Sequence, residues 1–197
     1  NPRDFGTQAL ILCPTRELAS QVASEIRRLA RYQQNIKVVT LCGGQSIGPQ
    51  IGSLEHGAHV VVGTPGRIKD HLHKETLSLE RISTLVLDEA DRMLEMGFID
   101  DIATIIGKTP SSRQTLLFSA TFPDNIQLLS SRFQSSPQRI SVESLHDDQQ
   151  ISQRFFVCHK DERLAAIVKL LTTFQPASAV VLCNTKVLVR EVCEYLD

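Results

Sequence analysis

The chain has 197 residues, of which 42% are hydrophobic, and its formal net charge is −1. That length and composition suffice for one domain with a sizeable core, or for one domain and part of another. The near-neutral charge excludes binding of nucleic acid through a bulk positive field, so any such contact has to come from local groups. No apolar run approaches the ~18 residues that a membrane-spanning helix needs.

Short apolar runs alternate with helical patterns along the first 140 residues. Because runs that are apolar throughout suit parallel strands covered on both faces, five of them are predicted strands: 8–13, 38–42, 59–63, 84–88 and 114–119. Apolar residues three or four apart, from Leu18 to Leu29, predict a helix over about 17–32 with that face turned inward. The alternation predicts an α/β fold with a doubly wound parallel sheet.

The composition changes at ESLHDDQQISQ (143–153), which is polar, lacks periodicity and predicts a linker. Beyond it, RFFVCHK (154–160) and AVVLC (179–183) are predicted strands, and a helical pattern follows each. We therefore expect a first domain over 1–143, a linker over 144–153 and the start of a second domain over 154–197.

Five cysteines are scattered along the chain and never spaced as C-x-x-C: Cys13, Cys42, Cys158, Cys183 and Cys193. Most lie in apolar runs, which predicts buried, reduced thiols with no disulfide-linked partner and no zinc site. The first residues, NPRDFGTQAL, resemble neither a signal peptide nor a transit peptide. We expect a monomeric, cytoplasmic protein that is not held in a membrane.

An unusual loop follows each of the five strands of the first domain. They are PTREL (14–18), GGQ (43–45), TPGR (64–67), the acidic stretch at 88–91 and SAT (119–121). Because open parallel sheets bind ligands beyond the carboxyl ends of their strands, we expect one site along this rim.

The first three of these loops have the properties of a phosphate-binding surface. Thr15 and Thr64 are placed to cap the helices that follow, and helix starts offer free N–H groups to a phosphate. Arg16 and Arg67 can add charge-assisted contacts, and the glycines at 43–44 let a sugar-phosphate backbone approach closely. For any one loop taken alone, an ordinary cap or turn is the alternative.

Three carboxylates follow the fourth strand: Asp88, Glu89 and Asp91. A carboxylate in this place can hold Mg²⁺ through water, and a neighbouring one can activate water for attack on a phosphoryl group. Asp88 would then serve the metal and Glu89 would be the base. A structural cluster is the alternative, because acids also favour the first turn of a helix.

Together, PTREL, GG, TPGR, DEAD and SAT, in this order and at these spacings, resemble the motifs of the DEAD-box RNA helicases. The resemblance covers essentially the whole chain, and VVLCNTK (180–186) is similar to the start of the family's second lobe. It implies two RecA-like lobes that close on ATP and single-stranded RNA, the first nearly complete here and the second only begun. Phrases such as SRQTLLFSAT (112–121) are most similar to a bacterial member that acts in ribosome assembly, which makes the implied RNA ribosomal.

The resemblance also implies roles for single residues. Asp88 would position Mg²⁺ through water, and Glu89 would orient the attacking water. Asp91 would hydrogen-bond Ser119 and Thr121 and so couple the nucleotide state to the RNA state. The RNA backbone would lie against a larger polar set: Thr15, Arg16, Gly43, Gly44, Thr64, Gly66, Arg67, Asn184 and Thr185.

The phosphate loop G-x-x-x-x-G-K-[ST], with which the family binds ATP, is not found in this sequence. The pair Gly107-Lys108 lacks the glycine loop before it and falls at a predicted helix end, so we do not assign it to ATP. The resemblance further implies a strand ahead of residue 1, beside the strand at 84–88. We therefore expect ATP and Mg²⁺ to be used by the whole protein, and the isolated chain to be inactive.

Three functions stay open at this point. The chain is part of a DEAD-box helicase that couples ATP hydrolysis to local unwinding of RNA duplexes, or it is a non-catalytic fragment that holds RNA backbone. The third is a metal-dependent phosphohydrolase that uses the same acids, although the sequence lacks the additional Asp or His ligands such a site needs.

Overall fold

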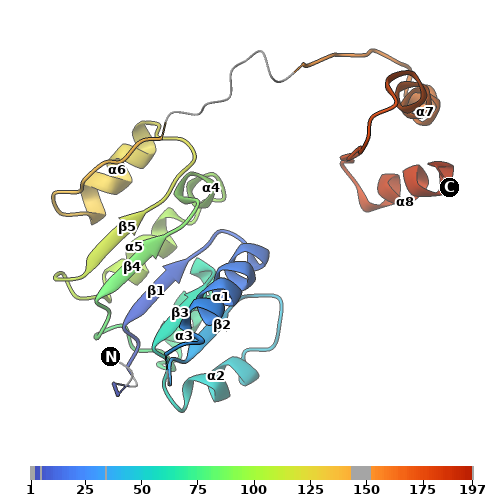
Figure 1. Ribbon diagram of the computed structural model, residues 1–197. Coiled ribbons are helices and arrows are strands. Elements are labelled where there is room, and N and C mark those ends of the chain that lie inside the picture. The colour runs from blue at the N-terminus through green and yellow to red at the C-terminus, as the bar shows by residue number, and fades with distance from the viewer. Residues whose placement is uncertain (1–2, 5, 34, 143–151, 197) are drawn as a thin grey trace. The chain divides into compact units, whose positions relative to one another are not determined.

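The computed structural model (Figure 1) describes residues 3–4, 6–33, 35–142 and 152–196. It divides into two compact units, Asn1–Ile140 and Ser141–Asp197, and each is treated by itself below. The predicted linker at 144–153 lies outside the described residues except for its last two positions. No helix that the structure describes is both long and apolar enough to span a bilayer.

A five-stranded parallel sheet forms the centre of the first unit. Its strands are β1 (Ala9–Leu12), β2 (Val38–Leu41), β3 (Val60–Gly63), β4 (Thr84–Leu87) and β5 (Gln114–Leu117). They lie in the order β2-β3-β1-β4-β5 and every pairing is parallel. The five predicted strands are confirmed, and each is one or two residues shorter than the apolar run that predicted it.

Helices cover both faces of this sheet (Figure 1). They are α1 (Arg16–Ala30), α2 (Gly48–Leu54), α3 (Pro65–His73), α4 (Ala90–Glu95), α5 (Ile99–Ile106) and α6 (Asp124–Phe133). Leu10 of β1 packs in one core with Ile102 of α5, whereas its neighbour Ile11 packs in a second core with Ala19 and Ala23 of α1. Because successive strand residues face opposite sides, these two cores confirm a doubly wound sheet.

The predicted inward face of α1 is confirmed at Leu18, Val22 and Ile26, which pack against the second core, but not at Leu29. Ala19 and Ala23 are buried, Leu18 is only partly buried, and Leu29 is 72% exposed. The alanines take the centre of the contact because their short side chains let the helix backbone approach the sheet. Leu29 lies in the last turn of the helix and packs in neither core.

Strand β4 has a partner on each side. Val86 aligns with Ile11 of β1 and with Leu116 of β5, so no further strand can lie beside β4. The expectation that a preceding strand pairs there is therefore wrong. Among the described strands the outer edges are those of β2 and β5, and β5 is lined by a groove of about 670 Å³ in which Phe118 is 55% exposed.

The second unit contains helices and no strand among its described residues. It has a 3₁₀ turn η1 (Lys160–Glu162), α7 (Arg163–Phe174) and α8 (Lys186–Leu196), which agree with the two helical patterns. The strands predicted at 154–160 and 179–183 are wrong for this structure, because an extended segment forms a ladder only with a neighbouring strand. Phe155 and Leu182, from these two segments, are each 91% exposed.

All five cysteines are free thiols, but they are not all buried. Cys13 and Cys42 are buried beside the first-unit sheet, and burial raises the pKa of Cys13 to about 12. Cys158 and Cys193 are exposed and Cys183 is intermediate. The expectation of buried thiols therefore fails in the second unit, whose apolar runs form no core strands.

Gly63 ends β3 where no side chain fits. A Cβ there would overlap the Leu41 carbonyl oxygen and come within 2.9 Å of Ile68 Cδ1. Gly63→Ala should lower the free energy of unfolding by about 1–3 kcal/mol, because the β2–β3 spacing has to change. Urea unfolding followed by circular dichroism measures this.

Gly52→Ala is the matched control. Nothing lies within 4 Å of a Cβ at Gly52. Helix propensity should therefore leave this variant unchanged or more stable by up to about 1 kcal/mol. Equal stability of the two variants would contradict the packing argument.

Candidate functional site

The five loops after the strands begin at one level of the sheet. Leu12 aligns with Gly63 on one side and with Leu87 on the other, and Leu87 aligns with Leu117. The structure therefore brings every first-unit motif named above to one rim, at the arrowheads of the strands in Figure 1. The acids follow β4, between the glycine- and arginine-bearing loops of β1, β2 and β3 and the Ser119–Thr121 loop of β5.

The turn after β4 holds Glu89 in an unusual backbone conformation. Glu89 has φ 49° and ψ 54°, in the left-handed region, and its N–H donates to Asp88 Oδ1 at 3.1 Å. A non-glycine residue with this geometry carries strain of about 1–3 kcal/mol, which tends to be kept where it serves function. Glu89 is exposed and Asp88 half-buried, so both carboxylates are accessible at the rim.

Asp91 joins the β4 turn to the loop after β5. Its Oδ2 accepts hydrogen bonds from Thr121 N at 3.0 Å and from Thr121 Oγ1 at 2.9 Å. The predicted contact of Ser119 with Asp91 is the weakest of these: its Oγ donates to the Thr121 carbonyl at 2.7 Å, and it adds the smallest of the hydrogen-bond effects on the pKa of Asp91. Ser119 therefore acts on this cluster mainly by fixing the Thr121 backbone.

The same contacts set the charge of Asp91. Burial works to raise the pKa of this carboxyl, but hydrogen bonds from Thr121, from the Arg92 N–H and from Ser119 together hold it below its usual value. Asp91 is thus ionised at neutral pH. Since its folded pKa is below the unfolded value of about 4, it stabilises the fold above that pH, and this contribution is lost as the pH falls through the folded pKa.

The glycine pair after β2 is tied to Arg16. Gly44 has φ 76°, and a Cβ there would overlap the Arg16 guanidinium, whereas a Cβ on Gly43 would meet nothing within 4 Å. Arg16 Nη1 lies 3.5 Å from the Gly43 carbonyl. Thr15 caps α1 as predicted, because its Oγ1 accepts from Leu18 N at 3.2 Å.

The start of α3 differs from the prediction in two ways. Thr64 occupies the N-cap position with Pro65 after it, but its side chain makes no cap hydrogen bond. Arg67 is only 10% exposed, and its Nη2 donates to the Gln45 carbonyl at 2.9 Å. Its Nε forms an ion pair with Asp70 Oδ2 at 3.6 Å, and neither Nε nor Nη1, both buried, has a hydrogen-bond partner within the described part of the chain.

Two predicted residues lie in the second unit. Asn184 and Thr185 precede α8 and are exposed, and Thr185 Oγ1 accepts from Leu188 N at 3.2 Å. Thr185 therefore caps the start of α8 in this unit.

Sequence reasoning missed two buried polar residues beside the rim, Gln50 and His71. Gln50 is 8% exposed and His71 is fully buried. Gln50 is the buried residue of α2, and His71 is buried with Pro65 and Ile68 on α3, but the sequence alone does not tell which polar residue of a helix faces inward.

The donor set fits a nucleotide-bound magnesium ion better than an ion held by protein alone. Among the described residues, no three His, Cys, Asp or Glu side chains gather as a metal site. Mg²⁺ commonly keeps several waters and takes one or two carboxylates plus substrate phosphates, and Asp88 can supply one such carboxylate. The phosphohydrolase alternative, which needs a fuller ligand set, has no support in this donor set.

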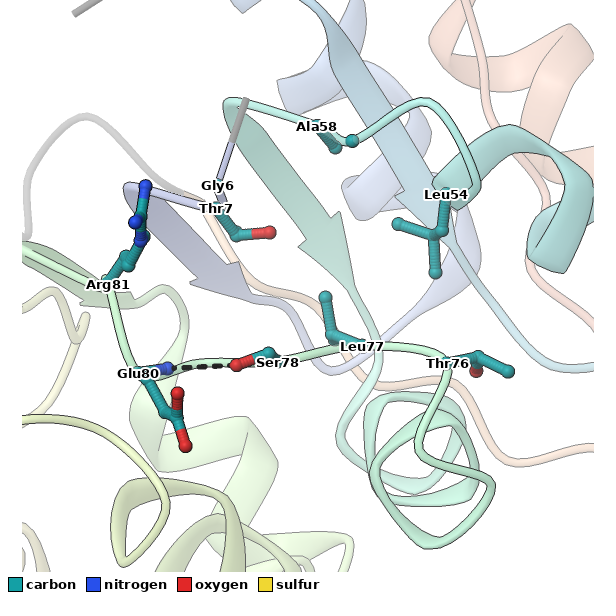
Figure 2. Close-up of a pocket in the computed structure, with 10 residues that line it drawn as sticks. Gly6, Thr7, Leu54, Ala58, Thr76, Leu77, Ser78, Glu80 and Arg81 are labelled. Atoms are coloured by element: carbon teal, nitrogen blue, oxygen red, sulfur yellow. Dashed lines mark hydrogen bonds between the residues drawn. The ribbon is translucent and has the colours of Figure 1, made fainter. Parts of the chain in front are cut away.

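The pocket in Figure 2 lies at the opposite end of the strands. Its volume is about 360 Å³, and its walls include Thr7 just before β1, Ala58 just before β3, and Thr76 after α3. None of the acids or arginines of the rim lines it. We therefore place the chemistry at the rim and not in this pocket.

Residues 1–129 match the DEAD/DEAH box helicase family. The chain belongs to this family. It is 52% identical over 193 residues to the ATP-dependent RNA helicase DbpA of Escherichia coli (strain K12), and 47% identical over 191 residues to the ATP-dependent RNA helicase CshA of Listeria monocytogenes. A DEAD box protein from Methanococcus jannaschii superimposes with a TM-score of 0.66 at 38% identity.

These matches cover nearly all of this chain but less of the relatives. The alignments span 98% and 96% of the chain, and only 42% of DbpA and 36% of CshA. The M. jannaschii structure is matched over 100% of this chain and 52% of its own. The first unit is thus the RecA-like sheet of a DEAD-box protein, and the acids after β4 are the residues for which the family is named.

The left-handed turn makes a prediction about stability. The free energy of unfolding should be about 1 kcal/mol higher for Glu89→Gly than for Glu89→Ala. Glycine adopts φ 49° without steric cost, and both variants lose the same carboxylate. Thermal and urea unfolding of the two variants provide the comparison. If the alanine variant proves the more stable, the turn is not strained.

Proposed function

We propose that this chain is the central part of an ATP-dependent RNA helicase, whose whole protein couples ATP binding and hydrolysis to local separation of RNA duplexes. One observation carries this proposal. The carboxylates after β4 lie on the same rim as the arginine- and glycine-bearing loops of β1, β2 and β3 on one side and the Asp91–Thr121 cluster on the other. One edge of the sheet could then contact both the nucleotide and the RNA.

On the nucleotide side, Asp88 would hold Mg²⁺ through water, and Glu89 would orient the attacking water and accept its proton. Bound Mg²⁺ would neutralise charge that develops on the phosphates. The exposed position of Glu89 leaves room for a water beside its carboxylate. The paired β4 backbone fixes the place of both acids.

On the RNA side, the loops after β1, β2 and β3 would contact the sugar-phosphate backbone. Arg16 and Arg67 would supply positive charge to phosphates, and Gly43 and Gly44 would allow close approach. Thr15, Thr64 and Gly66 complete this surface. Asn184 and Thr185 would add contacts from the second unit. Such contacts read no bases, so affinity would depend on salt and little on sequence.

The wider setting rests on the sequence alone. We propose ribosomal RNA as the partner, a monomer as the working form and the cytoplasm as the location. The first of these follows from the ribosome-assembly member to which phrases such as 112–121 are most similar.

A second function applies to the chain by itself. The sequence contains no G-x-x-x-x-G-K-[ST] loop, so we propose that residues 1–197 alone hold RNA backbone weakly and do not turn over ATP. ATPase assays on this chain and on the whole protein separate the two functions. Magnesium-dependent hydrolysis by the short chain would show that another loop cradles the phosphates.

Glu89→Gln in the whole protein should keep ATP binding and lose at least ~100-fold in turnover, the usual scale for a general base. Steady-state ATPase at saturating RNA gives kcat, and nucleotide titration gives affinity. The control is Glu95→Gln, which changes an exposed acid of the same helix. Turnover within a few fold of wild type for Glu89→Gln would remove this residue from the role.

Ser119→Ala combined with Thr121→Ala should leave RNA-stimulated ATP hydrolysis largely intact and reduce strand separation. The double variant removes the Thr121 hydroxyl from Asp91 and the Ser119 hydroxyl from the loop backbone, and neither group lies beside Glu89 in the hydrogen-bond network. ATPase and duplex-separation assays are run in parallel. An equal loss in both would indicate a structural role.

A further inference from the structure

Three side chains hold the carbonyl groups of the turn after β2. Gln50 Nε2 donates to the Cys42 carbonyl at 2.9 Å, and Arg67 Nη2 donates to the Gln45 carbonyl at 2.9 Å. Arg16 Nη1 makes a longer contact with the Gly43 carbonyl. The negative ends of these three peptide groups are therefore directed at donors, and a phosphate that approaches the glycines does not meet them.

A buried polar chain continues from this turn into α3. His71 Nε2 lies 3.3 Å from Gln50 Oε1, and His71 Nδ1 lies 2.8 Å from Thr76 Oγ1. Thr76 also lines the pocket of Figure 2, so the chain runs from that pocket toward the rim.

The roles of these groups follow from what each can do. The Cys42 carbonyl only accepts, so the Gln50 amide nitrogen faces it and Oε1 faces His71. Burial and the nearby positive charge of Arg67 lower the pKa of His71, so its ring is neutral at pH 7. The proton of the neutral ring then lies on Nε2, which donates to Gln50, and Nδ1 accepts the single Thr76 hydroxyl proton at 2.8 Å, in competition with the His71 carbonyl at 3.2 Å.

We propose that Gln50 and His71 are positioning residues for RNA-backbone binding: they hold the Cys42–Gln45 turn at a fixed place relative to the start of α3. The inference rests on the proposed function, because it assumes that both loops contact RNA.

His71 is suited to this role because it lies one helical turn after Arg67 on α3. One helix thus carries the arginine that contacts Gln45 and the histidine that supports Gln50. Two connections at different points fix both the distance and the orientation of the turn. Neighbouring phosphates have a fixed spacing, so two loops that contact them have to keep theirs.

The test measures RNA affinity and ATP turnover in the whole protein. A fluorescent ten-nucleotide oligouridylate is the probe, and its Kd is obtained by anisotropy in the presence of an ATP analogue. Gln50→Leu and His71→Leu should each raise the Kd about tenfold, the scale of a lost buried hydrogen bond with an orphaned partner. The kcat for ATP at saturating RNA should stay within about twofold of wild type.

Four further variants separate positioning from general destabilisation. His71→Gln keeps a donor for Gln50 and should recover most of the affinity. The double variant should bind about as weakly as Gln50→Leu alone, because contacting residues do not act additively. His73→Leu, an exposed histidine of the same helix, and Gln127→Leu, an exposed glutamine of α6, should bind like wild type.

The outcomes are distinguishable. If the wild-type protein does not bind the probe, the proposed function fails. If wild type binds and Gln50→Leu and His71→Leu bind within twofold of it, the positioning role is wrong while the function stands. If either variant loses kcat together with affinity and thermal stability, and His71→Gln restores nothing, the pair is structural only and the inference is overturned.

Discussion

The pairing of β4 with β1 on one side and β5 on the other is the constraint on which the rest of the site depends. A strand with both edges paired cannot slide or twist without breaking two ladders, so Asp88 and Glu89 start from a fixed point. The strand order then places loops that suit phosphates on one flank of the acids and the Thr121 loop on the other. The strand order therefore decides which loops flank the acids: those of β1, β2 and β3 on one side and that of β5 on the other.

The sheet and the loops on its rim are held by different kinds of contact. Backbone ladders and two apolar cores hold the sheet, whereas single side chains hold the loops on its rim. Asp91 contacts Thr121 across 30 positions of sequence, and it is half-buried. The loop that carries Thr121 is thus joined to the β4 turn by side-chain contacts and not by a backbone ladder.

Much of the fold was predictable because parallel strands buried on both faces leave continuous apolar runs, as at β1 and β3. The rim was predictable for the same reason, since motifs that follow parallel strands have to meet. What the sequence could not show depends on three-dimensional neighbours: the left-handed backbone of Glu89, the uncapped Thr64 and the buried Gln50–His71 pair. Apolar runs also predicted strands at 154–160 and 179–183, where the described unit offers no strand to pair with.

The contact between Arg16 and Gly44 has a consequence for how this family can change over time. Gly44 is restricted twice, by a φ of 76° and by the guanidinium that occupies the place of a Cβ. Shortening Arg16 would lift only the second restriction, and relaxing the backbone would lift only the first. No single substitution at position 16 or 44 removes both restrictions. We therefore expect the two residues to be replaced together in evolution or not at all.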